Sequence, residues 1–252
     1  MPERLTHTVA LITGASSGIG RATAVRLAAA GASVTLVARR QDDLRVLADS
    51  IAEAGGTALV FDGDISNSDT AAAAVDATIA RFGRLDTVVN AAGVMLIGES
   101  IGAPLEHWER MVDVNLKGLM FITKAALPHL VDAAVTSGRG VTDLVNISST
   151  AGRVVTPYTA LYNATKFAVT AATESWRQEY ATRSVRVSVI EPGAVDTELG
   201  HHQDATQDWY DQLSATGDIL SASDVADAVA YIVTNPARVA VGEIVIRPTQ
   251  QV

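Results

Sequence analysis

Short runs of apolar, largely β-branched residues alternate along this chain with longer alanine-rich stretches. Seven such runs are predicted as strands: Thr8–Ile12, Ser33–Val37, Ala58–Phe61, Thr87–Asn90, Asp143–Ile147, Arg186–Ile190 and Glu243–Ile246. Six stretches between them are predicted as helices: Gly18–Ala30, Gln41–Ala54, Asp69–Phe82, about Leu105–Ala134, Thr159–Ala181 and Ala222–Val233. Strands that are apolar at nearly every position are typical of parallel sheets covered on both sides. The alternation therefore predicts an α/β fold, a doubly wound parallel sheet with helices on both faces.

The chain has 252 residues and contains neither a linker rich in proline and serine nor an internal repeat. We therefore expect one domain over residues 1–252. The least regular part, Thr197–Gly217, is longer than an ordinary connection. Long loops often act as lids over binding sites, so residues 197–217 are predicted as a substrate lid, with a surface loop as the alternative.

No targeting or membrane-spanning segment is expected. The N-terminus lacks the apolar core of a signal peptide, and no apolar run approaches the ~20 residues that cross a bilayer. A cytoplasmic protein without a membrane partner is the resulting expectation.

Composition excludes several kinds of chemistry. The chain has no cysteine, which rules out disulfides, cysteine-based metal sites and a thiol nucleophile. Acidic residues outnumber basic ones by 28 to 19, and the resulting net charge of −9 disfavours nucleic acid as a partner. The pair His201-His202 lacks a third ligand at suitable spacing, so no metal site is expected.

A glycine-rich loop joins the first predicted strand to the first predicted helix, reading Thr13-Gly-Ala-Ser-Ser-Gly-Ile-Gly20. Glycine allows a positive φ and a close approach of the backbone to a ligand. A helix that begins at Gly18 points free N–H groups and its positive dipole end at a phosphate. This context predicts a dinucleotide site, with a plain tight turn as the alternative. The predicted contacts in the loop are Gly14, Ser16, Ser17, Gly18, Ile19 and Gly20.

The residues after the second strand indicate which dinucleotide binds. A carboxylate at this point would accept the ribose 2′-hydroxyl of NAD, but the sequence reads Ala38-Arg39-Arg40. Two guanidinium groups suit a 2′-phosphate. We therefore predict NADP(H) as the cofactor, held by Arg39 and Arg40. The alternative is that both arginines are solvated charges at a helix entrance.

Tyr162 and Lys166 are four residues apart on a predicted helix and so share one face. A free tyrosine has a pKa near 10, and a neighbouring ammonium lowers it by favouring the phenolate. The pair is thus a candidate general acid/base. Chance is a weaker explanation here than in most chains, because only Lys117, Lys124 and Lys166 are lysines.

Ser149 stands just past the end of a predicted strand, thirteen residues before Tyr162. Ligands of open α/β sheets bind at that edge, where a hydroxyl can donate a hydrogen bond to a substrate oxygen. A turn serine is the alternative. A serine nucleophile is not expected, because no G-x-S-x-G motif is present.

Taken together, these residues resemble the short-chain dehydrogenase/reductase family. The likeness covers roughly residues 8–233 and is carried by Thr13–Gly20, Asp64-Ile65, Asn90–Gly93, Asn115, Ser149, Tyr162-x-x-x-Lys166 and Pro192-Gly193. It implies one Rossmann-like domain with a seven-stranded parallel sheet, assembled as a homotetramer or a dimer. Several further stretches, among them Ile190-Glu-Pro-Gly193, resemble NADP-dependent reductases of the clavulanate dehydrogenase type.

The resemblance also implies roles for individual residues. Tyr162 would exchange a proton with the substrate oxygen, Lys166 would lower the tyrosine pKa and hold the nicotinamide ribose, and Ser149 would polarise the carbonyl. Asn115 would position a water that relays protons. The remaining cofactor contacts would be Asp64 and Ile65 beside the adenine, Asn90, Ala91 and Gly93 beneath it, and Pro192, Gly193, Val195 and Thr197 at the nicotinamide.

The implied activity is hydride transfer between NADP(H) and a small carbonyl or alcohol substrate. Ala91 departs from the family, which usually has a second asparagine there. Two alternatives stay open: reduction of an imine or activated double bond at the same site, and a non-catalytic NADP-binding sensor or scaffold.

Overall fold

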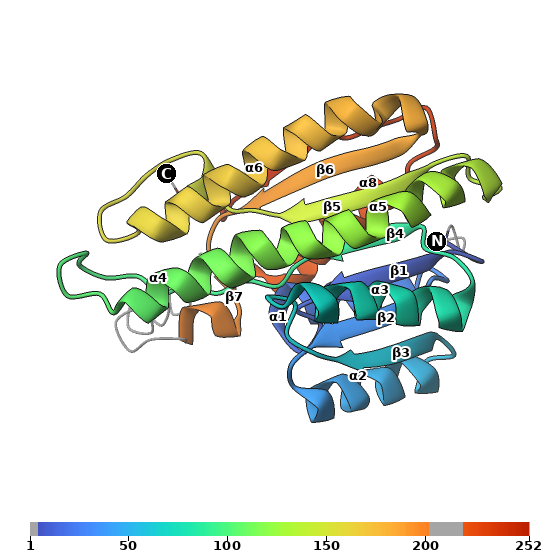
Figure 1. The fold of residues 1–252 in the computed structure, drawn as a ribbon, viewed down its shortest axis with the longest axis horizontal. Coiled ribbons are helices and arrows are strands. Elements are labelled where there is room, and N and C mark those ends of the chain that lie inside the picture. The colour runs from blue at the N-terminus through green and yellow to red at the C-terminus, as the bar shows by residue number, and fades with distance from the viewer. Residues whose placement is uncertain (1–4, 202–218, 252) are drawn as a thin grey trace.

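The computed structural model describes residues 5–201 and 219–251. Its main sheet consists of β1 (Val9–Thr13), β2 (Ser33–Ala38), β3 (Thr57–Asp62), β4 (Thr87–Asn90), β5 (Thr142–Ile147), β6 (Val185–Pro192) and β9 (Glu243–Ile246). All neighbours are parallel, in the order β3-β2-β1-β4-β5-β6-β9 (Figure 1). The predicted seven-stranded parallel sheet is confirmed.

The α-helices described are α1 (Gly18–Ala28), α2 (Gln41–Glu53), α3 (Ser68–Phe82), α4 (Leu105–Met111), α5 (Leu119–Thr136), α6 (Ala160–Tyr180) and α8 (Ala222–Thr234). Local sequence explains several of their ends. The Asn67 side chain caps α3 by accepting from two backbone N–H groups, and Gly83 with φ +75° ends that helix. Ser221 and Asp224 form a capping box at the start of α8.

Each strand of the sheet centre is buried on both faces. Along β1, Ala10 and Ile12 belong to a core shared with α1, α2 and α8, whereas Leu11 belongs to a core shared with α3 and α5. In Figure 1, α3, α5 and α6 cross in front of the sheet. This two-sided packing explains why the strands are apolar at nearly every position.

The strand order reverses between β1 and β4, and the loops that follow these two strands meet at that point. Thr13 Oγ1, at the end of β1, accepts hydrogen bonds of 3.1 Å from both Ala91 N and Ala92 N. Such a switch point is where open α/β sheets bind ligands. The glycine-rich loop therefore lies at the expected binding edge.

One predicted helix differs from expectation. Instead of one α-helix over about Leu105–Ala134, the structure has α4, a π-helical segment at Val112–Gly118, and then α5. Apolar spacing predicts that a helix is present but does not reveal a change of its hydrogen-bond ladder. Asn115 lies within the π segment, and such wide turns often occur at functional sites.

The same helical stretch bears on the membrane prediction. By length and composition alone, residues 105–136 could cross a membrane, contrary to the expectation that no stretch is apolar enough. Half of the most apolar window is buried inside the fold, and α5 packs against α3, β4 and β5. Core helices pass the same test, so the stretch is explained by its place in the core.

A second, small sheet pairs β7 (Val195–Asp196) with β8 (Leu220–Ser221). The sequence pattern did not predict it. It brackets the segment predicted as a lid, of which only residues 197–201 are described. Glu198–His201 form a short 3₁₀ helix, and residues 202–217 lie outside the described part, so the lid stays a prediction.

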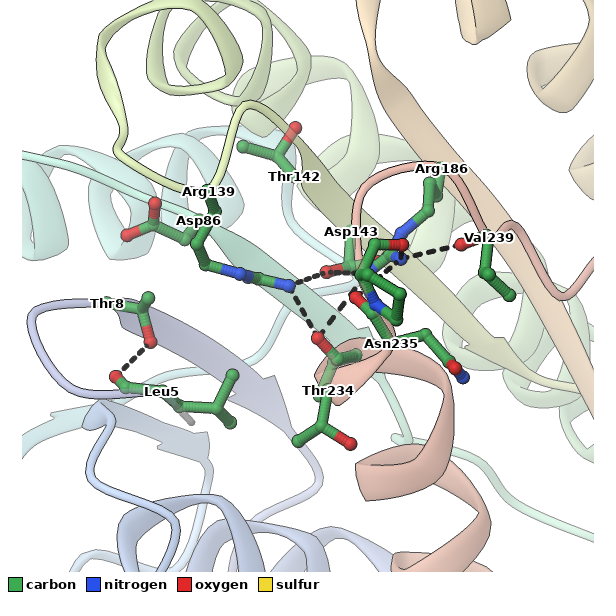
Figure 2. A network of polar contacts seen from close by, with 12 residues as sticks. Leu5, Thr8, Asp86, Arg139, Thr142, Asp143, Arg186, Thr234, Asn235 and Val239 are labelled. Atoms are coloured by element: carbon green, nitrogen blue, oxygen red, sulfur yellow. Dashed lines mark hydrogen bonds and ion pairs between the residues drawn. The ribbon is translucent and has the colours of Figure 1, made fainter. Parts of the chain in front are cut away.

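A buried ionic network lies at the opposite, amino edge of the sheet (Figure 2). Asp143 accepts from Arg186 Nε at 2.7 Å and Nη2 at 3.0 Å, and from Arg139 Nη2 at 3.1 Å. Arg186 also donates to the carbonyl groups of Asn235 and Val239. The network joins β5 and β6 to the segment that follows α8.

Candidate active site

Tyr162 and Lys166 lie one turn apart on α6, and each is 6% exposed. Lys166 Nζ lies 5.7 Å from the centre of the Tyr162 ring and donates to the Ile147 carbonyl at 3.0 Å. Burial lowers the pKa of Lys166 to about 8. The Tyr162 ring packs with Met95 and Met111. The structure therefore pairs a buried phenol with a buried amine, as the spacing predicts.

Ser149 lies at the carboxyl ends of β5 and β6. It caps the 3₁₀ turn Thr150–Gly152, where its Oγ accepts from Ala151 N at 3.1 Å. The same Oγ lies 3.4 Å from the Pro192 carbonyl, at the long limit of a hydrogen bond. Ser149 therefore caps a turn, and among the described residues the acceptor for its hydroxyl hydrogen is the distant Pro192 carbonyl.

Asn163 fastens the Ser149 turn to α6. Its Nδ2 donates to the carbonyl groups of Ala151 at 2.6 Å and Val154 at 2.9 Å. Ser148 Oγ adds a bond of 3.1 Å to the Lys166 carbonyl. These bonds fix the Ser149 turn against the helix that carries Tyr162 and Lys166.

Asn115 joins the loop after β4 to α6. Its Oδ1 accepts from Val94 N at 2.8 Å, and its Nδ2 donates to the Val94 carbonyl at 2.9 Å and to Thr165 Oγ1 at 3.2 Å. Both amide hydrogens are therefore used, whereas Oδ1 keeps a second lone pair. A Cβ on Gly93 would lie 3.5 Å from Asn115 Oδ1 and 3.9 Å from Lys166 Nζ. Gly93 thus leaves room between the amide and the amine.

The glycine-rich loop has the geometry of a phosphate cradle. Gly14 has φ +67°, and a Cβ there would lie 2.8 Å from Ala92 Cα; a Cβ on Gly20 would collide with the Gly14 carbonyl. Gly18, with φ +49°, begins α1, and its N-cap Ser17 makes no side-chain cap bond. The first N–H groups of α1 are therefore available to an anion. These features fit the pyrophosphate of a dinucleotide.

The two arginines after β2 differ in their contacts. Arg39 is exposed and makes no hydrogen bond or ion pair with the described residues. Arg40 donates to Ser16 Oγ in the glycine loop, at 3.2 Å from Nη2. It also forms ion pairs with Asp43 at 2.9 Å and Glu198 at 2.8 Å. Of the two arginines, Arg40 thus contacts the glycine loop directly, and the 2′-phosphate site stays a prediction.

The residues predicted around the adenine are held by neighbouring elements. Asp64 accepts from Ser66 N and Oγ at 3.0 and 2.7 Å and pairs with Arg110 at 3.1 Å. Burial raises the pKa of Asp64, but the bonds from Ser66 and Arg110 outweigh it and the net pKa is lowered. Ile65 is buried and packs against Gly118 in the π segment.

The Asn90 side chain links β4 to its neighbours α5 and β5 by hydrogen bonds. Its Nδ2 donates to Thr123 Oγ1 on α5 at 3.1 Å and to Asn146 Oδ1 on β5 at 2.9 Å. Asn146 in turn donates to Thr173 on α6 at 2.9 Å. Asn90 Oδ1 is buried without a partner among the described residues. This amide ladder fixes α5 and α6 to the strands that carry the site.

The turn from Pro192 to Thr197 bends back over the glycine loop. Gly193 N donates to the Ile246 carbonyl at 2.8 Å, and Val195 is buried in β7. A Cβ on Gly18 would lie 3.1 Å from Thr197 Cγ2. The predicted nicotinamide contacts therefore lie beside the predicted phosphate contacts.

Comparisons with known proteins agree with this geometry. A family model described as short chain dehydrogenase matches residues 8–208. The chain belongs to the short-chain dehydrogenase/reductase family. An uncharacterized oxidoreductase of Staphylococcus epidermidis is 37% identical over 240 residues, which cover 95% of this chain and 96% of the relative.

Two solved structures illustrate the structural likeness. A metagenomic short-chain oxidoreductase in complex with NADP has a TM-score of 0.82 and 31% identity, over 98% of this chain and 100% of that one. A 3-ketoacyl-(acyl-carrier-protein) reductase from Brucella melitensis, complexed with NADH, has a TM-score of 0.86 and 29% identity over the same shares. Both confirm the fold, and they carry different nicotinamide cofactors.

Sequence reasoning missed several residues that shape the site. Asn163 and Thr165 make bonds that place a predicted site residue or its turn, and Thr13, named in the glycine-rich motif without a role, accepts from the backbone after β4. Asn163 and Thr165 lie between Tyr162 and Lys166, so polar residues inside that short motif were an available signal. Gln251 had no such signal: its Oε1 accepts from Ala194 N at 2.9 Å beside the Pro192-Gly193 turn.

No group of three His, Asp or Glu side chains suited to a metal occurs in residues 5–201 and 219–251. His202 lies outside these ranges. The expected lack of a metal stays a prediction.

Proposed function

We propose that this short-chain dehydrogenase is an NADP(H)-dependent oxidoreductase that interconverts a carbonyl and an alcohol on a small molecule. The observation that carries the proposal is the buried Tyr162–Lys166 pair at the carboxyl edge of the sheet, with Ser149 on the adjoining turn. A buried amine beside a buried phenol has a clear use in proton transfer. Binding a dinucleotide alone would not require the pair.

In the direction of reduction, Tyr162 donates its phenolic proton to the substrate oxygen. The Lys166 ammonium stabilises the phenolate that remains. Ser149 Oγ donates a hydrogen bond to the same oxygen as negative charge develops there. The second lone pair of Asn115 Oδ1 binds a water near Lys166, through which the tyrosine regains a proton. NADPH, when bound, supplies the hydride to the carbonyl carbon.

The chain offers contacts for each part of the cofactor. Arg39 and Arg40 would bind the 2′-phosphate, and the N–H groups around Gly18 would bind the pyrophosphate. Asp64 and Ile65 would flank the adenine. The metagenomic relative complexed with NADP supports this assignment, whereas the Brucella reductase complexed with NADH shows that the family fold alone does not decide it.

A substrate panel tests the proposal. The full chain with NADPH is offered ketones, aldehydes, imines and activated alkenes, and consumption of NADPH is followed by its absorbance. We expect turnover with carbonyl compounds. Turnover confined to imines or alkenes would replace the substrate class, and binding of NADPH without turnover on any class would favour the sensor alternative.

Replacing Arg39 by Ala should weaken NADPH binding about 10- to 100-fold and leave NADH binding nearly unchanged. A charge-assisted hydrogen bond to phosphate is worth about 1.5–3 kcal/mol, and NADH has no phosphate at this position. Calorimetric titration of both cofactors measures the two dissociation constants. Arg45→Ala, which removes an exposed arginine of α2, is the control. An equal loss for NADH would show that Arg39 does not read the 2′-phosphate.

The rate should also depend on the charge of Lys166. Because burial lowers its pKa to about 8, Lys166 loses its proton as the pH rises through that value. Tyr162 then becomes a weaker acid, so kcat/KM for reduction should fall by about tenfold per pH unit above about pH 8. A profile measured with a substrate that has no ionisable group, alongside the NADPH dissociation constant at each pH, checks this. A flat profile between about pH 7 and about pH 9 contradicts it.

The chain is further proposed to act as one domain over residues 1–252 and to assemble as a homo-oligomer, a tetramer or a dimer. A groove of about 710 Å³ along α5 and α6 supports the assembly. It is lined by apolar side chains (Met120, Phe121, Leu127, Val131, Trp176 and Tyr180) and edged by both acidic and basic residues. A second copy of the chain would cover this groove.

Three further points stay predictions from sequence. They are the cytoplasmic location, the lack of nucleic-acid and membrane partners, and the likeness to clavulanate dehydrogenase.

A further inference from the structure

The Arg40 guanidinium joins three parts of the chain. Its Nε pairs with Asp43 on α2 at 2.9 Å, and its Nη2 pairs with Glu198 at 2.8 Å. Both nitrogens also lie within hydrogen-bond distance of Ser16 Oγ in the glycine loop, at 3.3 and 3.2 Å. Arg40 therefore already holds two carboxylates while facing the loop that would bind the cofactor.

The two carboxylates reach Arg40 from different places. Asp43 lies three residues along the same chain segment, so its pairing is local. Glu198 follows Thr197, whose methyl group approaches Gly18 at the start of α1. Glu198 thus follows the segment predicted to contact the nicotinamide, yet its carboxylate pairs with Arg40, which is predicted to bind the 2′-phosphate.

The Arg40–Glu198 pair is exposed enough to exchange. The two side chains are 46% and 55% exposed, so water and salt weaken their attraction. Arginine presents a planar fork of N–H donors, which suits a phosphate better than a single carboxylate oxygen. A phosphate that approaches Arg40 and Ser16 must share or take the donor that Glu198 now uses.

We propose that Glu198 is a cofactor-selecting residue that competes with the 2′-phosphate of NADP(H) for Arg40. This inference rests on the proposed use of NADP(H). A bare 2′-hydroxyl has no charge with which to displace Glu198, so NADH binds with the ion pair intact. The 2′-phosphate displaces it and binds less tightly than an unopposed Arg40 would allow. Glu198 thereby reduces the preference for NADPH over NADH.

The test compares the full chain with its Glu198→Gln variant. Dissociation constants for NADPH, NADH and the fragment 2′,5′-ADP are measured by calorimetric titration at low and high salt. We expect NADPH and 2′,5′-ADP to bind about two- to fivefold more tightly in the variant, the range for an exposed ion pair, with NADH unchanged. The gain should shrink at high salt. No gain, or the same gain with NADH, overturns the proposal.

Two further variants separate competition from a general charge effect. Asp42→Asn removes the same charge from a neighbouring residue that pairs with Arg45 and not with Arg40, and it should give a smaller gain than Glu198→Gln. In an Arg40→Gln background, Glu198→Gln should no longer affect NADPH. If Asp42→Asn raises NADPH affinity equally, or if Glu198→Gln still raises it without Arg40, then Glu198 acts only through the electrostatic field of the whole protein.

The same set distinguishes this inference from the proposed function. If Arg40→Gln weakens NADPH but Glu198→Gln changes nothing, the competition fails and the NADP(H) assignment stands. If neither Arg39→Ala nor Arg40→Gln changes the ratio of NADPH to NADH affinity, the assignment itself fails, and the competition fails with it.

Discussion

Turnover should fall by about 10³-fold or more when Tyr162 is replaced by Phe. General acid–base catalysis contributes about 10²- to 10⁴-fold, and the change removes only the phenolic hydroxyl that would carry the proton. The ring would keep its packing against Met95 and Met111 and its place near Lys166 Nζ. The loss should therefore appear in kcat with little change in stability. Initial rates of NADPH consumption at saturating substrate measure it.

NADPH binding and folding provide the controls for that variant. The dissociation constant for NADPH should stay within about twofold, because binding depends mainly on the arginines and the glycine loop. Tyr231→Phe, which removes an exposed hydroxyl from α8, should leave the rate unchanged. Retained turnover in Tyr162→Phe would remove Tyr162 from the mechanism.

The largest effect on stability is expected at the amino edge of the sheet. Replacing Arg186 by Leu should lower the free energy of unfolding by about 3–5 kcal/mol, the cost of leaving a buried ion-pair partner without its counter-charge. Asp143 is fully buried and takes two of its three arginine bonds from Arg186 (Figure 2). The carbonyl groups of Asn235 and Val239 would lose their donor as well.

Urea unfolding of the wild type and the variant measures this difference. The matched control is Arg177→Leu, because Arg177 forms a similar two-pronged pair with Glu174 on the exposed side of α6. An exposed pair contributes at most about 1 kcal/mol. If both variants lose the same small amount, the buried network does not stabilise the fold as argued. Both arginines lie away from the Tyr162 site, so activity at low temperature should persist in folded protein.

The strands and most helices could be predicted from sequence because their signals are local. The apolar run Ser33–Val37 differs from the observed β2 by one residue, and the helix predicted from Gln41 begins there. The π segment at Val112–Gly118 could not be predicted in this way. Residues of this segment contact distant parts of the fold, Asn115 with Val94 and Gly118 with Ile65, and apolar spacing carries no trace of such contacts.

In the candidate site, too, local spacing predicts some features and tertiary contacts set the others. Tyr162 and Lys166 are one helical turn apart, so their pairing follows from spacing alone. The spacing does not show that Lys166 is buried or that it donates to the Ile147 carbonyl. The lowering of the Lys166 pKa follows from its burial. Gln251, close to the end of the chain, reaches the Pro192-Gly193 turn only because β9 pairs with β6.

Local sequence was enough to predict the class of fold, the family motifs and a basic rather than acidic end of β2 at Arg39 and Arg40, because each depends on residues that are close in the chain. The tertiary structure alone decided which groups meet at the switch point between β1 and β4. It brought Glu198 onto Arg40 and Thr197 over Gly18. These contacts arise from strand order and helix packing, which act between segments far apart in sequence and leave no periodic pattern in either one.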